Sequence, residues 1–522
     1  MMKKVLAALL AVAMIFCLVA CGDDKQQAQE GGEKKVKDTM TIVIESEGTD
    51  FDPINGGAAI SSTSVSRNVY EGLVRTDANG NIIPLLATEW KMADDGMSIT
   101  FKLREGVKFH NGEDFDADDV MYTWTQVHAV QRAKSETTFD FAHAEKLGQY
   151  EVKLPLLRKA SDAINLLTNK VYSIYNQKGR EAEGDQIGRK PVGTGPYKFD
   201  PAKWVVGDRF VLDAFEDYWG EQPAFKQITV RIIKESTQAQ IELENGNVDA
   251  VVFNTGNDDV VRVLNGEVEG LETQPVFNGI NVIFFNSTKE FSKNKLLRQA
   301  FQYAIDREAL AKGDSLGLNT PAYQTVIPGY SGYIEDYNTN HPFPYDPDKA
   351  AQLVKDAGYP NGITLEMYSD AGKLAALDGQ LLKNMLAKAN ININLHPLES
   401  GTFVPLAQAG VEDDLLISIM INDYYASPLM RFRMNVDNSF KPDWDQSAKT
   451  DFYAPLKDAF DKASNTTDAA ELEKYFLEMN KLEVEESLVI PLNTMNIWVS
   501  SKKGLHIQWN CGDPNFSKWY FE

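Results

Sequence analysis

The second half of this 522-residue chain alternates helix with strand, and that order restricts the fold more than any other feature of the sequence. Residues 374–389 are expected to form a helix, Asn390 can take the left-handed conformation that ends it, and residues 391–395 alternate as a strand does. Asp346 and Pro347 give an earlier helix its start signal, an N-cap residue followed by proline. A helix followed by a strand, repeated, predicts an α/β sheet.

Shorter elements are predicted along the rest of the chain. Strands are expected at residues 41–44, 99–103, 107–109, 150–154 and 415–420. Helices are expected at residues 61–73, 120–130, 295–311 and 471–486. No internal repeat interrupts this order, and the length predicts two to four structural domains.

The first residues have the organisation of an export signal. Met1 to Lys4 is basic, and residues 5–19 are apolar and uncharged, a run shorter than the roughly 20 residues of a transmembrane helix. Residues 18–21, with the sequence LVAC, resemble the lipobox of bacterial lipoproteins. This resemblance implies a signal peptide over residues 1–20 and a diacylglyceryl group on Cys21. The alternative is an ordinary signal peptide that is cut elsewhere.

Residues 21–38 are expected to form a flexible tether, because they are polar, contain no aromatic residue and cannot bury enough apolar surface to fold. The folded part would then lie at the extracytoplasmic face of the cell membrane, held only by lipid. The formal net charge of −23 disfavours nucleic acid and anionic lipid as partners. Cys17 would leave with the signal, so Cys511 has no disulfide partner, and a monomer is expected.

The sequence shows no catalytic or metal-binding pattern. No two of the six histidines stand four residues apart, and neither a nucleophile elbow nor a phosphate-binding loop is present. Residues 114–118 contain three aspartates, but Asp119 stands where a calcium loop needs glycine and Thr125 where it needs glutamate. The expected structure there is the acidic start of a helix. The sequence therefore predicts no enzyme, no metal and no cofactor.

Several blocks, in order along the chain, resemble those of the family 5 solute-binding proteins of ATP-driven (ABC) importers, which include oligopeptide, dipeptide and nickel receptors. The blocks are residues 52–53 (DP), 70–73 (YEGL), 85–90 (LLATEW), 98–120 (SITFKLREGVKFHNGEDFDADDV), 193–197 (GTGPY), 285–286 (FN), 297–307 (LRQAFQYAIDR) and 345–360 (YDPDKAAQLVKDAGYP). The resemblance spans roughly residues 40 to 500, nearly all of the mature chain.

The resemblance implies an α/β, two-lobe fold like that of periplasmic binding proteins (type II, cluster C). Lobe I would contain residues 39–285 and 487–522, with an extra subdomain inserted at about residues 71–192. Lobe II would contain residues 286–486. Two crossover strands would join the lobes, and a solute enclosed between them would shift a hinge equilibrium toward closure.

The implied function is a lipid-anchored extracytoplasmic receptor that captures a peptide and delivers it to the permease of an ABC importer. A non-peptide solute is the alternative within the same fold: an oligosaccharide, an opine-like compound or a metal chelate. Two other classes are an exported enzyme and a sensor or adhesin that has lost transport.

Candidate ligand-binding residues follow from the resemblance and from side-chain chemistry. Peptide-binding members pair an aspartate of the second lobe with the free amino group of the ligand, and Asp423 matches that position, although it could instead hold a turn. Tyr70, Tyr424 and Tyr425 offer apolar faces with polar tips, although core packing is the other interpretation of Tyr70. Asn493 is expected near the second crossover strand, where it would bond the ligand or hold the hinge.

Overall fold

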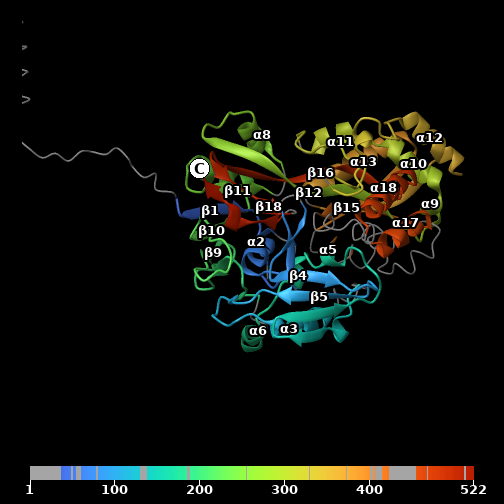
Figure 1. The fold of residues 1–522 in the computed structure, drawn as a ribbon. Coiled ribbons are helices and arrows are strands. Elements are labelled where there is room, and N and C mark those ends of the chain that lie inside the picture. Colours follow the sequence, from blue (N-terminus) through green and yellow to red (C-terminus); the bar gives the residue numbers. More distant parts are fainter. Residues whose placement is uncertain are drawn as a thin grey trace, which may run out of the picture. The chain divides into compact units, whose positions relative to one another are not determined.

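One mixed sheet of ten strands extends through the described part of the chain (Figure 1). The strand order is β14-β13-β15-β12-β16-β11-β1-β10-β9-β8. The strands are β1 (Thr39–Ile44), β8 (Tyr197–Phe199), β9 (Arg209–Ala214), β10 (Gln227–Ile232), β11 (Ala250–Phe253), β12 (Leu271–Phe285), β13 (Ile363–Asp370), β14 (Ile391–Leu398), β15 (Leu415–Ile421) and β16 (Val489–Lys502). Helices accompany this sheet, which confirms the α/β class.

The computed structural model describes most of the chain after residue 36. The described ranges are residues 37–48, 51–54, 60–77, 80–129, 138–184, 188–253, 256–314, 316–328, 330–371, 373–399, 402–403, 406, 414–421, 454–466, 468–510 and 513–522. The statements below refer to these residues.

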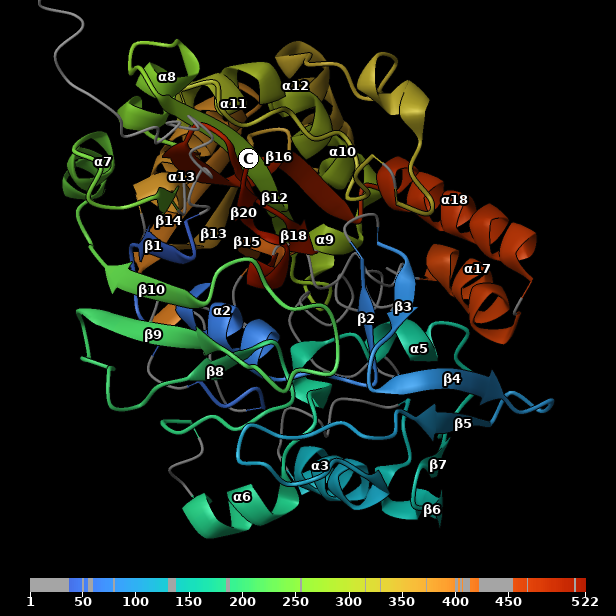
Figure 2. The same ribbon diagram turned by 60° about the vertical axis from the view of Figure 1, so that its left-hand side comes forward.

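A smaller antiparallel sheet has the order β4-β5-β7-β6 and lies beside α3 (Figure 2). Its elements are β4 (Ala87–Met92), β5 (Ser98–Leu103), β6 (Glu145–Gly148), β7 (Glu151–Pro155) and α3 (Ala117–Ala129). Short strand pairs are β2 (Val74–Thr76) with β3 (Ile82–Pro84), β17 (Leu505–His506) with β20 (Tyr520–Phe521), and β18 (Trp509–Asn510) with β19 (Asp513–Pro514).

The remaining helices are distributed along the whole described chain. They are α2 (Ile60–Val69), α5 (Ala163–Leu166), α6 (Gln177–Glu183), α7 (Ser236–Glu244), α8 (Asp258–Leu264), α9 (Glu290–Lys293), α10 (Lys295–Ala304), α11 (Arg307–Asp314), α12 (Pro347–Asp356), α13 (Lys373–Lys388), α17 (Ala454–Asn465) and α18 (Ala469–Glu485). Single 3₁₀ turns occupy Phe141–His143, Lys170–Tyr172, Glu335–Asn338 and Phe516–Lys518.

Hydrophobic side chains form two large cores, which define two bodies of the molecule. The first core combines α2, α3 and β1 with the C-terminal tail, and it contains Met40, Val65 and Trp519. A second cluster, under α7 and α8, belongs to the same body. The second core combines α10, α12, α13, α17 and α18, and a smaller cluster around Val282 lies beside it. We call these the first and the second body.

The helix signals around α12 and α13 are confirmed. Asp346 accepts a hydrogen bond from the Lys349 amide at 2.9 Å, as an N-cap does. Asn390 has a φ of 59°, and β14 begins at the next residue. Local signals alone therefore locate these helices and the following strand.

The single helix expected at residues 295–311 is wrong, because the chain forms α10 and α11 with a break between them. Asp306 causes the break by capping a new helix, since its carboxylate accepts a hydrogen bond from the Ala309 amide at 3.0 Å. The guanidinium group of Arg307 donates to the carbonyl of Gln302 at 3.2 Å, which satisfies one acceptor that the break releases.

Two further expectations also need correction. Residues 107–109 form no strand, and Lys108 makes only an isolated bridge with Asp114. The helix expected at residues 61–73 ends at Val69, where residues 193–195 pass very close to its backbone. A Cβ atom on Gly193 would lie 2.0 Å from the carbonyl oxygen of Val69, so only glycine fits this crossing.

His110 lies at the same crossing as a half-buried, neutral ring. Its Nε2 atom lies 2.9 Å from the carbonyl oxygen of Gly195, and its Nδ1 atom accepts a hydrogen bond from the Gly193 amide at 3.3 Å. These two contacts use one donor and one acceptor, as the neutral ring provides. Burial lowers the pKa of His110 to about 4.

We predict that acid destabilises the fold through His110. Below pH 6.5 the imidazole of His110 binds a proton in the unfolded chain, whereas in the folded chain it stays neutral down to about pH 4. The free energy of unfolding should therefore fall by about 3 kcal/mol across this window. Urea unfolding at pH 7, 5.5 and 4.5 measures this loss. His110→Gln should flatten the pH dependence, whereas His143→Gln, which alters an exposed ring, should not. Equal pH dependence in the parent and His110→Gln would contradict the assignment.

Candidate ligand site

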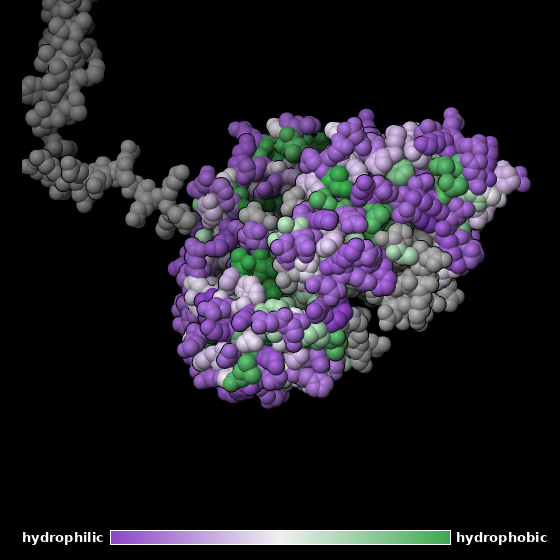
Figure 3. All heavy atoms as spheres, turned by 45° about the vertical axis from the view of Figure 1, so that its right-hand side comes forward, coloured by the Kyte–Doolittle hydropathy of each residue, from purple (hydrophilic) through white to green (hydrophobic). Residues whose placement is uncertain are grey.

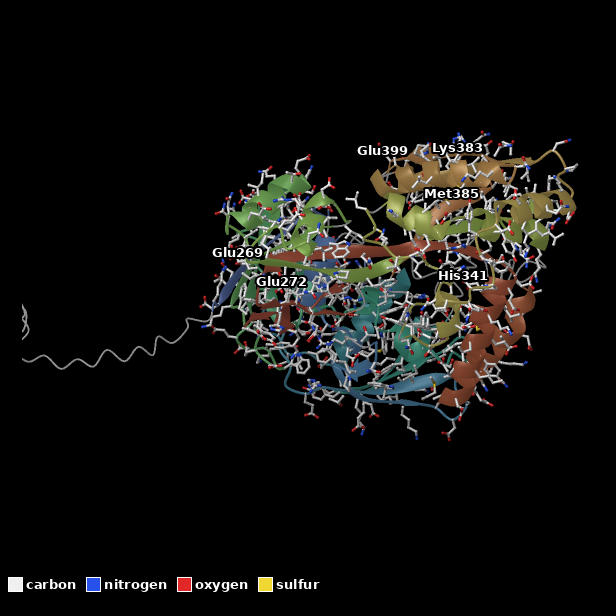
Figure 4. All side chains as sticks on the ribbon, turned by 90° about the horizontal axis from the view of Figure 1, so that it is seen from above. Glu269, Glu272, His341, Lys383, Met385 and Glu399 are labelled. Carbon is white, nitrogen blue, oxygen red and sulfur yellow. The ribbon has the colours of Figure 1, made fainter. Side chains whose placement is uncertain are left out.

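Two long antiparallel strands connect the two bodies. Ile497 and Val499 of β16 belong to the first core, whereas Ile490 and Leu492 of the same strand belong to the second. Its partner β12 starts in the cluster under α7 and α8 and ends in the second core at Phe285. Figure 4 labels residues of both bodies, with Glu272 in the first and Met385 in the second. The pair β12 and β16 is therefore a crossover.

The two crossover strands change in burial and in pairing register near their middle. Residues 274–278 and 494–496 are exposed or half-buried, between buried stretches at residues 279–285 and 497–501. The pairing register shifts twice near this point, once between Phe277 and Gly279 and once at Asn281. Such bulges bend a strand pair and increase its twist. The crossover therefore has its irregular section between the two bodies.

Asn493 lies within β16 at this irregular section. Its side-chain oxygen accepts a hydrogen bond from Nδ2 of Asn281 at 2.8 Å, and both residues are buried. The bond joins the two crossover strands through side chains as well as through the backbone. This contact favours the hinge interpretation of Asn493, and its role toward a ligand stays a prediction.

The parallel strands of the second body end at the crossover. β13, β14 and β15 run parallel, so their carboxyl ends at Asp370, Leu398 and Ile421 share one edge of the sheet. Ile421 pairs with Gly279 of β12, which in turn pairs with Met495 of β16. The edge is therefore level with the middle of the crossover.

The parallel strands of the first body end close to the same place. β1, β10 and β11 run parallel, and Phe253 at the end of β11 pairs with Trp498 of β16. Trp498 stands three positions after Met495 in β16, a distance of about 10 Å along a strand. Ligands of open α/β sheets bind outside the carboxyl ends of strands. Both sets of carboxyl ends therefore indicate a ligand site between the bodies.

Residues 318–322, which we call the strap, lie along the side of β16 that faces away from β12, next to this site. The amide of Thr494 donates to the carbonyl of Thr320 at 2.8 Å, and the amide of Thr320 donates to the Thr494 hydroxyl at 2.9 Å. The side chain of Leu318 reaches the cluster under α7 and α8, where a Cβ atom on Gly256 would lie 2.3 Å from it. The strap therefore contacts both bodies.

An open groove with a volume of about 460 Å³ lies between α11 and this strap. Asp306, Glu308 and Lys312 give it a mixed charge, and Pro321, which forms a β-bridge with Asn493, also lines it.

The face drawn in Figure 3 is mostly hydrophilic, with separate hydrophobic patches. This surface agrees with the acidic composition of the chain.

Tyr70 lies in the first core. Its side chain is buried, and its ring meets the edge of the Tyr175 ring at a centroid distance of 6.0 Å. It lines a small cavity of about 30 Å³ together with Glu71 and Arg75. This environment favours core packing over contact with a ligand.

Glu71 is a buried carboxylate for which the sequence gave no expectation. It accepts hydrogen bonds from the Thr194 hydroxyl at 2.8 Å, the Tyr218 hydroxyl at 2.9 Å and the Trp219 indole at 2.8 Å. Burial raises its pKa, and these donors together with the charge of Arg75 oppose the rise. The donors come from residues more than 100 positions away, so no local pattern indicates them.

The other predicted functional residues lie outside the described residues. They are Cys21, Asp423, Tyr424, Tyr425 and Cys511. β15, which precedes Asp423 in the sequence, ends at Ile421. Among the described residues, no group of three or more histidine, cysteine, aspartate or glutamate side chains is arranged to hold a metal ion. None of the helices formed by these residues is long and apolar enough to span a membrane.

The crossover and the two sets of strand ends define a two-body solute-binding protein. A model of the family described as "Bacterial extracellular solute-binding proteins, family 5 Middle" matches residues 81–439, and the chain belongs to this family. Its members are transport proteins that bind solutes and are not enzymes, which confirms that expectation. The family resemblance of the sequence blocks is confirmed as well.

Curated relatives include the glutathione-binding protein GsiB of Escherichia coli O1:K1, which is 27% identical over 490 residues and aligned over 92% of this chain and 93% of its own. The periplasmic binding protein DppA of Helicobacter pylori, solved with the peptide STSA, has a TM-score of 0.77 at 22% identity, over 93% and 98% of the two chains. NikA of Brucella suis, solved with Fe(III)-EDTA, has a TM-score of 0.78 at 21% identity, over 93% and 100%. These structures share the fold.

We predict that the bond between Asn281 and Asn493 stabilises the crossover. Asn281→Ala removes the donor from a buried acceptor, so the free energy of unfolding should fall by about 1–3 kcal/mol. Urea unfolding measures the loss. Asn278→Ala, on the same strand and half-buried, is the matched control and should change stability less. Equal losses of unfolding free energy in both variants would show that this bond does not stabilise the crossover specifically.

Proposed function

We propose that the chain is a lipid-anchored extracytoplasmic receptor that captures a peptide by closure of the two bodies and delivers it to the permease of an ABC importer. The observation that carries the proposal is the crossover, whose exposed middle lies at the carboxyl ends of the parallel strands of both bodies. A solute bound there contacts both bodies at once only when they are close together. Binding then shifts the equilibrium toward the closed form.

The predicted lobes correspond in this proposal to the two bodies. Lobe I, residues 39–285 and 487–522 with the insertion at about 71–192, matches the composition of the first core. Lobe II, residues 286–486, would supply most of the second core, which also contains Ile283, Phe285, Leu488, Ile490 and Leu492 from the segments assigned to lobe I. The bulges of β12 near Gly279 and Asn281 lie a few residues before the predicted boundary at residue 285 and would provide the bend.

Asp423 is proposed as the partner of the peptide's amino group. It follows Ile421 by two residues, which span at most about 7 Å, and Ile421 pairs with Gly279 at the crossover. An enclosed ammonium group requires a carboxylate because an unpaired buried charge is costly. Tyr424 and Tyr425 would supply apolar faces next to it.

The solute class is tested with the full chain purified in detergent. Tetra-alanine, glutathione, agropinic acid and Fe(III)-EDTA represent the solutes named for relatives and their chemistry. A solute at 100 times its dissociation constant should stabilise the protein by about 2.7 kcal/mol. The midpoint temperature of thermal unfolding should rise when a peptide is added. Stabilisation by agropinic acid or Fe(III)-EDTA alone would replace the peptide proposal with the non-peptide one.

Asp423→Ala should weaken tetra-alanine binding by about two to three orders of magnitude, because it leaves the enclosed ammonium unpaired at a cost of about 3–5 kcal/mol. N-acetylation of the peptide should weaken binding to the parent and add little loss in the variant. Calorimetry on both proteins with both peptides, after unfolding and refolding to strip bound solute, gives the four affinities. Equal affinity of parent and variant would assign Asp423 to the turn.

Cys21→Ala should release the protein from membranes or leave its signal uncut, because the sulfur atom that takes the lipid is absent. Cell fractionation with immunoblotting measures both outcomes. Cys17→Ala, inside the apolar run, is the matched control and should stay membrane-bound. A processed, membrane-bound Cys21→Ala protein would show that the anchor is elsewhere.

A further inference from the structure

Among the described residues, a side-chain hydrogen bond connects the two bodies far from the crossover in sequence. The hydroxyl of Ser161 donates to the carbonyl oxygen of Ala463 at 2.8 Å. Ser161 lies between Ala160 and Ala163 of the first core, whereas Ala463 is fully buried in the second core. Figures 1 and 2 both show α5, which follows Ser161, next to α17.

The acceptor is a group that α17 cannot satisfy itself. Ala463 lies in the last turn of α17, Ala454–Asn465, and the last four carbonyls of a helix have no partner within the helix. The hydroxyl of Ser161 therefore caps a helix of the other body. Ala463 and the next residue, Ser464, are both buried, whereas Ser161 is half-buried.

A second contact between the bodies supports the first. Gly80, in the turn between β2 and β3 of the first body, lies against the ring of Tyr330, which packs on the Val282 cluster of the second body. A Cβ atom on Gly80 would lie 3.6 Å from Cε1 of Tyr330, and its φ of 81° suits glycine. The described residues of the two bodies therefore touch here and at Ser161, as well as at the crossover and the strap.

We propose that Ser161 and the last turn of α17 form a latch that holds the two bodies together and slows release of the bound solute. The latch rests on the proposed closure of the two bodies. Solute must enter before the bodies meet, so a contact between them acts mainly on dissociation. A net hydrogen bond of ordinary strength corresponds to about a two- to tenfold change in affinity.

The test compares the parent chain with Ser161→Ala in detergent, using tetra-alanine as the probe. The dissociation constant should rise about two- to tenfold, with a faster dissociation rate and an unchanged association rate in stopped-flow measurements. Ser161→Thr keeps the hydroxyl and should restore the parent values. Thr237→Ala, on an exposed face of α7, is the matched control and should change none of them.

Hydrogen–deuterium exchange of α17 tests the contact without solute, because the free protein also populates the closed form that carries it. Amides in its last turn should exchange about two- to tenfold faster in Ser161→Ala than in the parent or Thr237→Ala. If Ser161→Ala exchanges faster but tetra-alanine does not bind the parent, the exchange result supports the latch. The missing binding then contradicts the peptide proposal. Unchanged exchange together with unchanged tetra-alanine kinetics would overturn the latch.

Discussion

The pairing of β12 with β16 is the constraint on which the rest of the structure depends. It is the only pairing in the described sheet whose two strands each carry side chains into cores of both bodies. The hydrophobic contacts of the first body end near Trp498, and those of the second begin near Ile280. The other strands of the ten-strand sheet are aligned through this pair, so its register decides where their carboxyl ends meet.

Buried polar groups fix the connections that hydrophobic contact leaves undefined. The hydrogen bond between Asn281 and Asn493 joins the crossover strands. Glu71, just after α2, accepts hydrogen bonds from three side chains. The ring of His110 is hydrogen-bonded to the backbone of Gly193 and Gly195. Each such group is costly without its partners, so these networks select one arrangement of the chain. Two of these groups, Glu71 and His110, lie in the first body and bind partners from distant segments of the chain.

Local signals predicted the elements that are decided locally. The cap at Asp346, the left-handed Asn390 and the strand after it are examples, and all are confirmed. The break at Asp306 was missed because the apolar periodicity of α10 continues across it, whereas a carboxylate cap and the Arg307 bond decide the conformation. β12 has no regular alternation, since its middle is exposed and its end is buried on both faces, so local patterning did not indicate it. Of the predicted site, Asn493 lies at the crossover, and its position came from the family resemblance. The partners of Glu71 could not be predicted, because the fold brings them together from distant residues.

The first core draws on both ends of the chain, and this has a consequence for biogenesis. Met40 and Val65 pack in the same core as Ile497, Phe516 and Trp519, and Trp519 is among its largest fully buried side chains. A chain that emerges with its amino end first has all residues of the second body available before the first body can close. Until the last residues arrive, the cavity that Trp519 fills stays open and the apolar faces of β1 and α2 remain uncovered. A holding factor, or a pause in delivery near the end of the chain, would protect these surfaces from aggregation.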